Sequence, residues 1–488
     1  MPLDPTVATT SGVVRGRTED GIAVFRGIPY AAPPVRFGAP RPVRPWDGVR
    51  EASRFGPPPL QSGAFGADAL AEGVEANDVG WLTVNVWSPD LGGGLPVMVW
   101  IQGGAYLFGT SGLPQYDGGR LARGGVVLVT FNYRVGLEGF GYVAGTPANR
   151  GLLDQVAALG WVRDNIAAFG GDPDRVTVFG QSAGGGSVGA LLAMPRAAGL
   201  FQRAIAQSLP GTFFTPALAE DITRACAAEL GLEPEELPTT DPELLPVATD
   251  EVLATMTQHA DRWGLAAHAQ VPVAPVVDGE VLPTTPWRGL TGDVALLVGH
   301  TRHEQRLLTA MSGLLGEITA ELAAETAELF GPDPGRYRSA FSDPEELYEV
   351  VRSDWLFRMP SLLLAAAQVG AGGPAYLYEL TWPAPGMGGG FGACHGLDVP
   401  LVFGNLTAGQ PALLIGEPTP EAEAVSEQLR AAWIAFATYG DPGWPRYDTG
   451  ATRIFDVEPA VTAYPETISQ EIWREPPGVL DLQTQPPI

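Results

Sequence analysis

Residues 176–187, VTVFGQSAGGGS, form the segment that most constrains how this chain can fold. An apolar, β-branched run leads into the pentapeptide GQSAG (180–184), and small residues then open into a helix-like stretch. This pattern predicts a strand that turns sharply into a helix and pushes the serine hydroxyl out of the sheet. The flanking glycines remove Cβ atoms that would clash with the helix and the neighbouring strand. Ser182 is therefore predicted to lie at a helix N-terminus, where unpaired N–H groups favour negative charge.

A serine nucleophile needs a base, an acid that orients the base, and N–H donors for an oxyanion. All five histidines lie C-terminal to Ser182, which fits the chain order Ser, then Asp or Glu, then His. His395 lies in the glycine-flanked loop FGACHGLDVPLVFG, which can present an imidazole at the rim of a sheet. The alternative for His395 is an ordinary surface-loop histidine. His259 and His268 lie in a stretch with a helical pattern and are expected to be solvated or packed.

Two acidic residues are candidates for the acid that orients the base. Glu304 follows the apolar run at 294–299 and a polar turn, which places it just past a predicted strand. Catalytic groups in open α/β sheets gather at the carboxyl ends of the strands. Asp278 is the competitor, although an Asp-Gly pair between valines is typical of a turn. The residues by themselves leave this choice open.

A second glycine-containing segment predicts the oxyanion site. The apolar strand predicted at 95–101 is followed closely by Gly103, Gly104 and Ala105. Small side chains there let backbone N–H groups approach a ligand, as the glycine-rich motif of lipases and esterases does. A further donor is expected from the N–H of Ala183, the residue after the serine. The alternative is an ordinary strand-to-loop glycine pair.

Apolar runs separated by helical patterns predict a mostly parallel sheet. The strand candidates are 95–101, 125–131, 175–180, 202–207, 294–299 and 375–381, and a helical pattern spans 152–168. No linker, repeat or low-complexity tract divides the 488 residues. We therefore expect a single domain over 1–488.

Nearly the whole chain resembles the type-B carboxylesterase family, which includes the cholinesterases and the bacterial p-nitrobenzyl esterases. The most specific block is RGLLDQVAALGWVRDNIAAFGGDPDRVTVFGQSAGG. Other matching segments follow the expected order, namely FRGIPYAAPP, WLTVNVWSP, PVMVWIQGGAY, FNYRVGLEGF, PVVDGEVLP, VGHTRHE, DWLFRMPSLLLAAAQ and CHGLDVPLVFG. The resemblance implies a single catalytic domain over 1–488 with an α/β-hydrolase fold. Its central, mostly parallel, twisted sheet is expected to be flanked by helices, with a helical lid-like insertion within about 210–390.

The resemblance also implies a set of catalytic roles. Ser182 matches the family's nucleophile, Glu304 its acid and His395 its base. The matched oxyanion donors are Gly104, Ala105 and Ala183. These roles imply a serine carboxylesterase that hydrolyses neutral carboxylic esters through a covalent acyl-enzyme, without a cofactor or metal. The alternatives are an amide, carbamate or lactone hydrolase with the same triad, or a non-catalytic binding homologue.

The sequence departs from the family pattern at three positions. Gln102 stands where a histidine is common, and Trp81 stands where secreted members carry a disulfide cysteine. Gln181, which with Gly103 should adjoin the reacting groups, stands where glutamate is usual. A neutral amide gives up the Coulomb attraction that a carboxylate would offer to a cationic ligand. We therefore expect no strong preference for quaternary ammonium esters.

The pocket that would select a substrate is not defined by these motifs. Several aromatic residues could line it, but aromatic side chains bury well whatever their function, so most are expected to be core. They are Phe213, Phe214, Trp263, Trp287, Trp355 and Phe357.

The amino-acid composition limits the classes of molecule that the protein is expected to bind. All 29 basic residues are arginines, and the formal net charge is −26. This strong negative charge disfavours nucleic acid and anionic membranes as partners. A small-molecule ester is the expected partner, and the sequence does not indicate the oligomeric state. Cys226 and Cys394 are not expected to pair, and no spacing of Cys or His suggests a metal site. The N-terminus has no signal-like segment and no apolar run reaches about 18 residues, so a cytoplasmic protein is expected.

Overall fold

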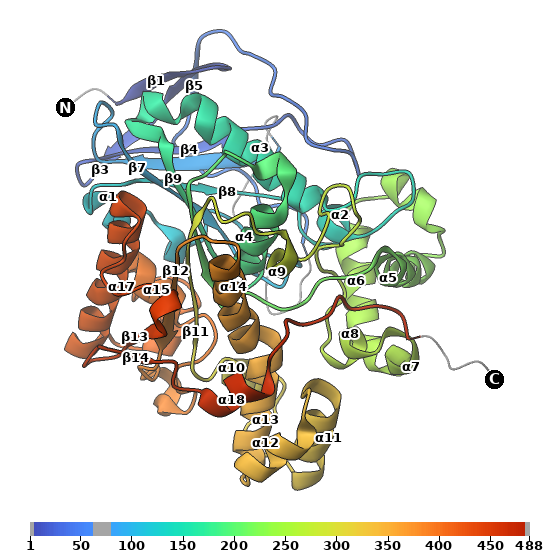
Figure 1. Cartoon of the computed structure of the whole chain (residues 1–488). Helices are drawn as coiled ribbons and strands as arrows, with labels where there is room; N and C mark the ends of the chain where they lie inside the picture. The colour runs from blue at the N-terminus through green and yellow to red at the C-terminus, as the bar shows by residue number, and fades with distance from the viewer. Residues whose placement is uncertain (1–3, 62–79, 484–488) are drawn as a thin grey trace.

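The computed structural model describes residues 4–61 and 80–483, and one long twisted sheet forms its centre (Figure 1). By position in the sheet, all neighbouring strand pairs from β8 (Val127–Phe131) to β13 (Ala451–Phe455) are parallel, whereas the pairs outside this range are antiparallel. In order across the sheet, the strands are β14 (Ala460–Ala463), β13 (Ala451–Phe455), β12 (Ala375–Leu380), β11 (Ala295–Thr301), β10 (Arg203–Gln207), β9 (Gly171–Gln181), β7 (Leu95–Ile101), β8 (Val127–Phe131), β6 (Thr83–Ser88), β4 (Ile22–Pro29) and β3 (Arg17–Glu19). A small second sheet holds β1 (Thr6–Thr9), β2 (Gly12–Arg15) and β5 (Val49–Glu51).

The strands have continuous apolar runs because both faces of the sheet are covered. In β7, Val97, Val99 and Ile101 belong to one buried core, whereas Met98 and Trp100 belong to the other. This alternation follows from the two-residue period of a strand. The α/β-hydrolase fold predicted for the chain is confirmed, and each of the predicted strands forms.

Helices pack on both faces of the sheet and position the loops that follow its strands. The first core packs against α3 (Arg150–Asn165), α4 (Ala183–Ala193) and α14 (Met359–Gly370). The second packs against α1 (Gly119–Arg123), α15 (Asp398–Phe403) and α17 (Pro420–Tyr439). Shorter helices are α2 (Gly136–Phe140), α9 (Pro286–Gly289), α16 (Ala412–Ile415) and α18 (Thr467–Ile472).

The range 210–390 holds two groups of helices separated by β11 (Figure 1). The first group is α5 (Pro216–Glu229), α6 (Leu244–Thr255), α7 (Ala260–Trp263) and α8 (Leu265–His268). The second is α10 (Arg306–Met311), α11 (Ala320–Phe330), α12 (Pro334–Ala340) and α13 (Pro344–Ser353), of which α11–α13 project away from the sheet. That these groups act as a lid stays a prediction.

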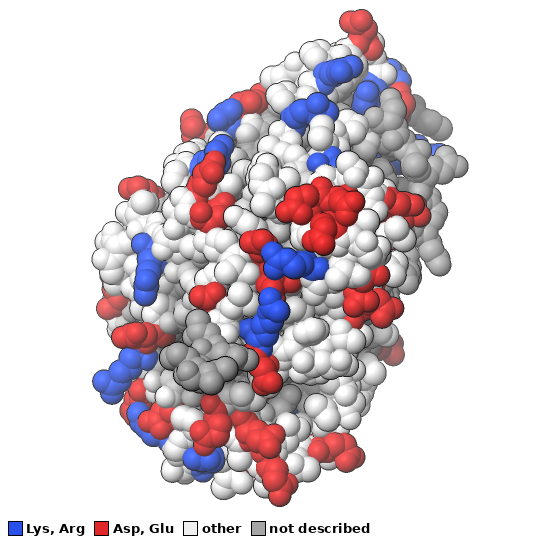
Figure 2. All heavy atoms as spheres, turned by 90° about the vertical axis from the view of Figure 1, so that its right-hand side faces the viewer, with Lys and Arg blue, Asp and Glu red and all other residues white. Residues whose placement is uncertain are grey.

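The charged side chains on the surface are distributed as the acidic composition leads us to expect. On the face that Figure 2 shows, arginines are interspersed with acidic side chains and do not gather in one basic patch. Cys226 and Cys394 are both buried and free. Within the two described ranges, no helix is both long and apolar enough to cross a bilayer. The same ranges hold no group of three or more His, Cys, Asp or Glu side chains placed to bind a metal ion.

The turn from β9 into α4 depends on a very close backbone contact. A Cβ atom at Gly184 would lie 2.0 Å from the carbonyl oxygen of Ile101 in β7. No side chain fits there, so α4 can start directly above the sheet only because this residue is glycine. Gly160 in α3 differs, because a Cβ atom there would meet nothing within 4 Å.

We expect Gly184→Ala to lower the free energy of unfolding by about 3 kcal/mol or more, because α4 and β7 must separate. Gly160→Ala serves as the matched control and should raise it by roughly 0.5–1 kcal/mol through helix propensity. Urea unfolding followed by tryptophan fluorescence measures both changes. A wild-type unfolding midpoint for Gly184→Ala would contradict the contact described.

Candidate active site

Ser182 lies between β9 and α4 in a backbone conformation that few residues other than glycine adopt. Its φ is 58° and its ψ is −127°, and such strain persists only where surrounding structure enforces it. The N–H of Ser182 donates to the carbonyl of Gln207 at the end of β10, at 3.0 Å. The side chain is only partly buried. The predicted strand–turn–helix is thus present, with the serine as N-cap of α4.

Glu304 and His395 form the shortest contact of the site. Glu304 follows β11 and is fully buried, and its Oε2 lies 2.5 Å from Nδ1 of His395. Its other oxygen, Oε1, accepts the N–H of Thr301 at 2.7 Å and the hydroxyl of Ser208 at 2.6 Å. Burial opposes ionisation, but the charge and hydrogen bond of His395, with the other two bonds, hold the pKa of Glu304 below its ordinary value. The site therefore contains a carboxylate that orients the imidazole.

Asp278, the competing acid, is engaged elsewhere. Its Oδ1 accepts the backbone N–H groups of residues 280–282, which caps a tight turn. Among the two candidates, the structure brings only Glu304 into contact with His395. Asp278 thus has the role that is typical of the aspartate in an Asp-Gly pair, which is to stabilise a turn.

The far edge of the imidazole faces Gln181. The side-chain nitrogen of Gln181 lies 3.1 Å from Nε2 of His395. With its Nδ1–H donated to Glu304, a neutral imidazole presents a lone pair at Nε2, and the Gln181 amide donates to it. Within the described residues Ser182 Oγ makes no hydrogen bond. A hydrogen bond between a serine hydroxyl and its catalytic base is often long in the absence of substrate, and it tightens when substrate binds.

The predicted oxyanion segment packs directly against the elbow. A Cβ atom at Gly103 would lie 2.7 Å from the carbonyl oxygen of Gln181. The chain then turns sharply, with φ of 114° at Gly104 and 53° at Ala105. Turns with left-handed residues aim neighbouring N–H groups to one side, which creates an anion-binding concavity. Ala183 is the first residue of α4, so its N–H has no acceptor within the helix.

The loops that carry Glu304 and His395 are joined through His303. Its backbone N–H donates to Ala393 at 2.9 Å, and the N–H of Ala393 returns a bond to Nδ1 of His303 at 3.3 Å. Burial, aided by the charges of Arg306 and Arg302, lowers the pKa of His303 to about 4. The ring is therefore neutral near pH 7 and can accept this bond. His303 thereby fixes the separation of the two loops.

Two further residues of the site, Ser208 and Asp398, were not predicted from the sequence, and a third, Phe357, was named only among the aromatic residues that could line the pocket. Ser208, which bonds Glu304, directly follows the predicted strand 202–207, so the rule about carboxyl ends of strands could have found it. Asp398 is buried near His395, and burial raises its pKa to about 6, although the Gln207 amide donates to it at 2.7 Å. Phe357 stacks on His395 with ring centroids 4.2 Å apart. No local sequence signal indicated that contact.

The expectation that most candidate aromatic residues are core agrees with their burial. Relative exposure is 8% or less for all of them, namely Phe213, Phe214, Trp263, Trp287, Trp355 and Phe357. Phe357 is the one whose ring contacts a predicted site residue.

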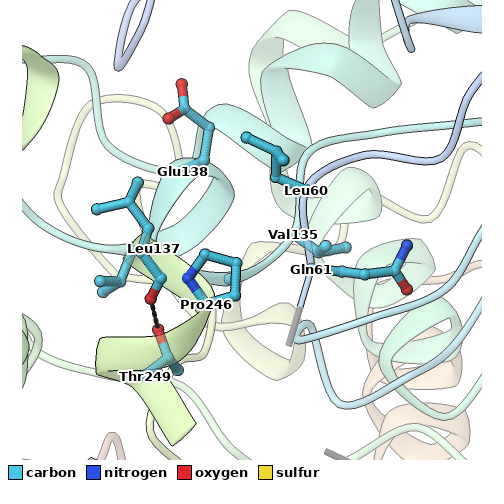
Figure 3. Close-up of a pocket in the computed structure, with 9 residues that line it drawn as sticks. Leu60, Gln61, Val135, Leu137, Glu138, Pro246 and Thr249 are labelled. Carbon is cyan, nitrogen blue, oxygen red and sulfur yellow. Dashed lines mark hydrogen bonds between the residues drawn. The ribbon is translucent and has the colours of Figure 1, made fainter. Parts of the chain in front are cut away.

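A small cavity lies between α2 and α6 (Figure 3). Its volume is about 10 Å³, and Leu60, Gln61, Val135, Leu137 and Pro246 are among the residues that line it. That volume accommodates about one water molecule. None of the lining residues is a predicted site residue, so this cavity is not a substrate pocket.

Comparison with known proteins identifies the family of the chain. A family model described as the carboxylesterase family matches residues 3–330 and 336–471. The para-nitrobenzyl esterase of Bacillus subtilis (strain 168) is 38% identical over 492 residues, covering 94% of this chain and 96% of that protein. The chain belongs to the carboxylesterase family. It is therefore a carboxylic ester hydrolase.

Solved structures of other carboxylesterases support the same assignment. A PNB esterase structure matches with a TM-score of 0.84 at 34% identity, covering 97% of this chain and 100% of that chain. The Geobacillus stearothermophilus carboxylesterase EST55 at pH 6.2 matches with a TM-score of 0.83 at 34% identity, covering 96% and 100%. The likeness extends over nearly the whole carboxylesterase fold.

We expect Ser208→Ala to lower kcat for an ester by about tenfold, because Glu304 loses a hydrogen bond made to its charged form. KM should stay within about twofold. Steady-state kinetics with p-nitrophenyl butyrate measures both. Ser187→Ala is the matched control, since Ser187 is buried in α4 and bonds Gln155 instead. Equal losses in the two variants would show that Ser208 acts only through packing.

Proposed function

We propose that this carboxylesterase hydrolyses neutral carboxylic esters through a covalent acyl-enzyme on Ser182. The 2.5 Å contact between Glu304 and Nδ1 of His395 is the observation that carries the proposal. It leaves Nε2 as the only imidazole nitrogen able to take a proton. The contact of Nε2 with Gln181, the residue before the serine, places that nitrogen beside the elbow. A nucleophile, a base and an orienting acid are thereby available in the order required.

In the first step, Ser182 Oγ attacks the ester carbonyl while Nε2 of His395 takes the hydroxyl proton. The Gln181 amide must leave Nε2 for this to happen. Glu304 stabilises the imidazolium that forms, and backbone N–H groups stabilise the oxyanion. The proposed donors are Gly104, Ala105 and Ala183.

In the second step, the tetrahedral intermediate collapses. The C–O bond to the alcohol breaks, the alcohol takes the proton from His395, and an ester of Ser182 remains. Water then attacks that ester while His395 accepts one of its protons, and as the bond to Ser182 breaks the carboxylic acid leaves and His395 returns the proton to Ser182 Oγ. Neutral esters are favoured because the residue beside the nucleophile, Gln181, carries no charge that would attract a cationic group.

We expect Ser182→Ala to lower turnover of p-nitrophenyl acetate, butyrate and octanoate by about 10⁴-fold or more, without unfolding the protein. Circular dichroism checks the fold. Wild-type activity in this variant would disprove the assignment of the nucleophile.

Matched amide and lactone substrates, assayed alongside, test whether esters are the preferred class. A folded wild type that neither turns over esters nor reacts with an organophosphate would support a non-catalytic role.

A choline ester should offer no advantage to the wild-type enzyme. We expect kcat/KM for acetylcholine to be no higher than for 3,3-dimethylbutyl acetate, its uncharged counterpart with the same acyl group. Gln181→Glu should raise the ratio of the two values by about tenfold, because a carboxylate attracts the quaternary ammonium. Gln181→Met is the control that changes the side chain without adding charge. A wild-type preference for acetylcholine would overturn the argument from charge.

A further inference from the structure

The face of the catalytic imidazole is covered by a phenylalanine from the lid-like region. The rings of Phe357 and His395 are stacked, with centroids 4.2 Å apart and planes inclined by 24°. Phe357 is 4% exposed and the His395 side chain 11%. Glu304 and Gln181 contact the two nitrogen edges of the same ring. The imidazole is thus bounded on two edges and one face.

Phe357 reaches this position because the helix that carries it is irregular. Residues Asp354–Arg358 form a π-helical turn between α13 and α14, in which the N–H of Met359 donates to the carbonyl of Asp354. Pro360 has no N–H, so the carbonyl of Leu356 lacks its regular helical donor. That carbonyl instead accepts the N–H of Gly211 at 2.8 Å. π-helical turns of this kind are frequent at functional sites.

Both ends of the π-helical turn are anchored by buried charges. Arg358 is within 3.2 Å of Asp354 and within 3.0 Å of Glu466, next to α18. Asp354 also accepts the hydroxyl of Tyr337 at 2.7 Å. A buried ion pair is costly to break, because removing one partner leaves an uncompensated charge. The turn is therefore fixed, and with it the ring of Phe357.

We propose that Phe357 is a positioning residue of the esterase, which holds the imidazole plane in the orientation that proton transfer from Ser182 requires. The proposal rests on the triad mechanism given above. The bond to Glu304 fixes one nitrogen of His395 but leaves the ring free to tilt about that bond. Stacking removes this freedom, and the electron-rich face of Phe357 also favours the imidazolium that forms during catalysis.

Trp355 provides a matched control on the same π-helical turn. It is 5% exposed, so its burial resembles that of Phe357. Its ring packs on Phe330, with centroids 4.8 Å apart. Trp355→Leu therefore disturbs the same turn without removing the ring that stacks on His395.

The first test compares kcat and KM for p-nitrophenyl butyrate. Phe357→Leu should lower kcat about tenfold with KM within about twofold, and Phe357→Tyr should restore most of the rate. Trp355→Leu should lower the melting temperature but keep kcat within about twofold. An unchanged kcat in Phe357→Leu, an equal loss in Trp355→Leu, or an effect confined to KM would each overturn the proposal.

The second test does not depend on turnover. In protein labelled with ¹³C-histidine, the ring current of Phe357 should shift the Cε1–H signal of His395 upfield, and His395→Gln assigns that signal. Phe357→Leu should move it downfield, whereas Trp355→Leu should not. An unmoved signal in Phe357→Leu would overturn the stacking. A wild type without ester turnover would instead overturn the proposed function, so the two failures are distinguishable.

Discussion

The active site depends on how closely the backbone of α4 approaches the end of β7. Gly184 leaves no room for a Cβ atom beside the carbonyl of Ile101, and this lets the helix begin immediately after the strand. The strained conformation of Ser182 is the geometric consequence, because the chain must reverse direction within one residue. Ile101 pairs with Gly180 across the sheet, so the segment after β7 and Ser182 are neighbours by register. One backbone contact therefore positions both Ser182 and the proposed oxyanion segment.

The order of the strands arranges the rest of the site along the same edge. β9, β10 and β11 are adjacent, and they are followed by Ser182, Ser208 and Glu304 in that spatial order. Ser208 N–H donates to the carbonyl of Gly299 at 2.8 Å, which ties β10 to β11 just below the carboxylate. His395 comes from a loop outside the sheet. Its position therefore depends on contacts such as the paired bonds between His303 and Ala393.

Much of this fold was predictable, because buried parallel strands carry apolar runs that are visible in one sequence. The helical pattern predicted at 152–168 shows the limit of such patterns at the end of an element, since α3 is Arg150–Asn165. Local pattern alone left the choice between Glu304 and Asp278 open, and the choice of Glu304 depended mainly on the resemblance. Phe357 was visible only as an aromatic residue, because its contact with His395 depends on a π-helical turn. Helical periodicity assumes regular turns, so it does not describe this one.

Charge balance explains why a neutral residue suits position 181. The site already contains Glu304, whose carboxylate is paired with His395, and Asp398, whose pKa is raised to about 6 by burial. A third carboxylate next to them would have to lose its water in a region that already holds two acids. The amide of Gln181 meets Nε2 of His395 by a hydrogen bond without that cost. A glutamate at position 181, which the family resemblance leads us to expect, would add an attraction for cations that the amide of Gln181 does not supply.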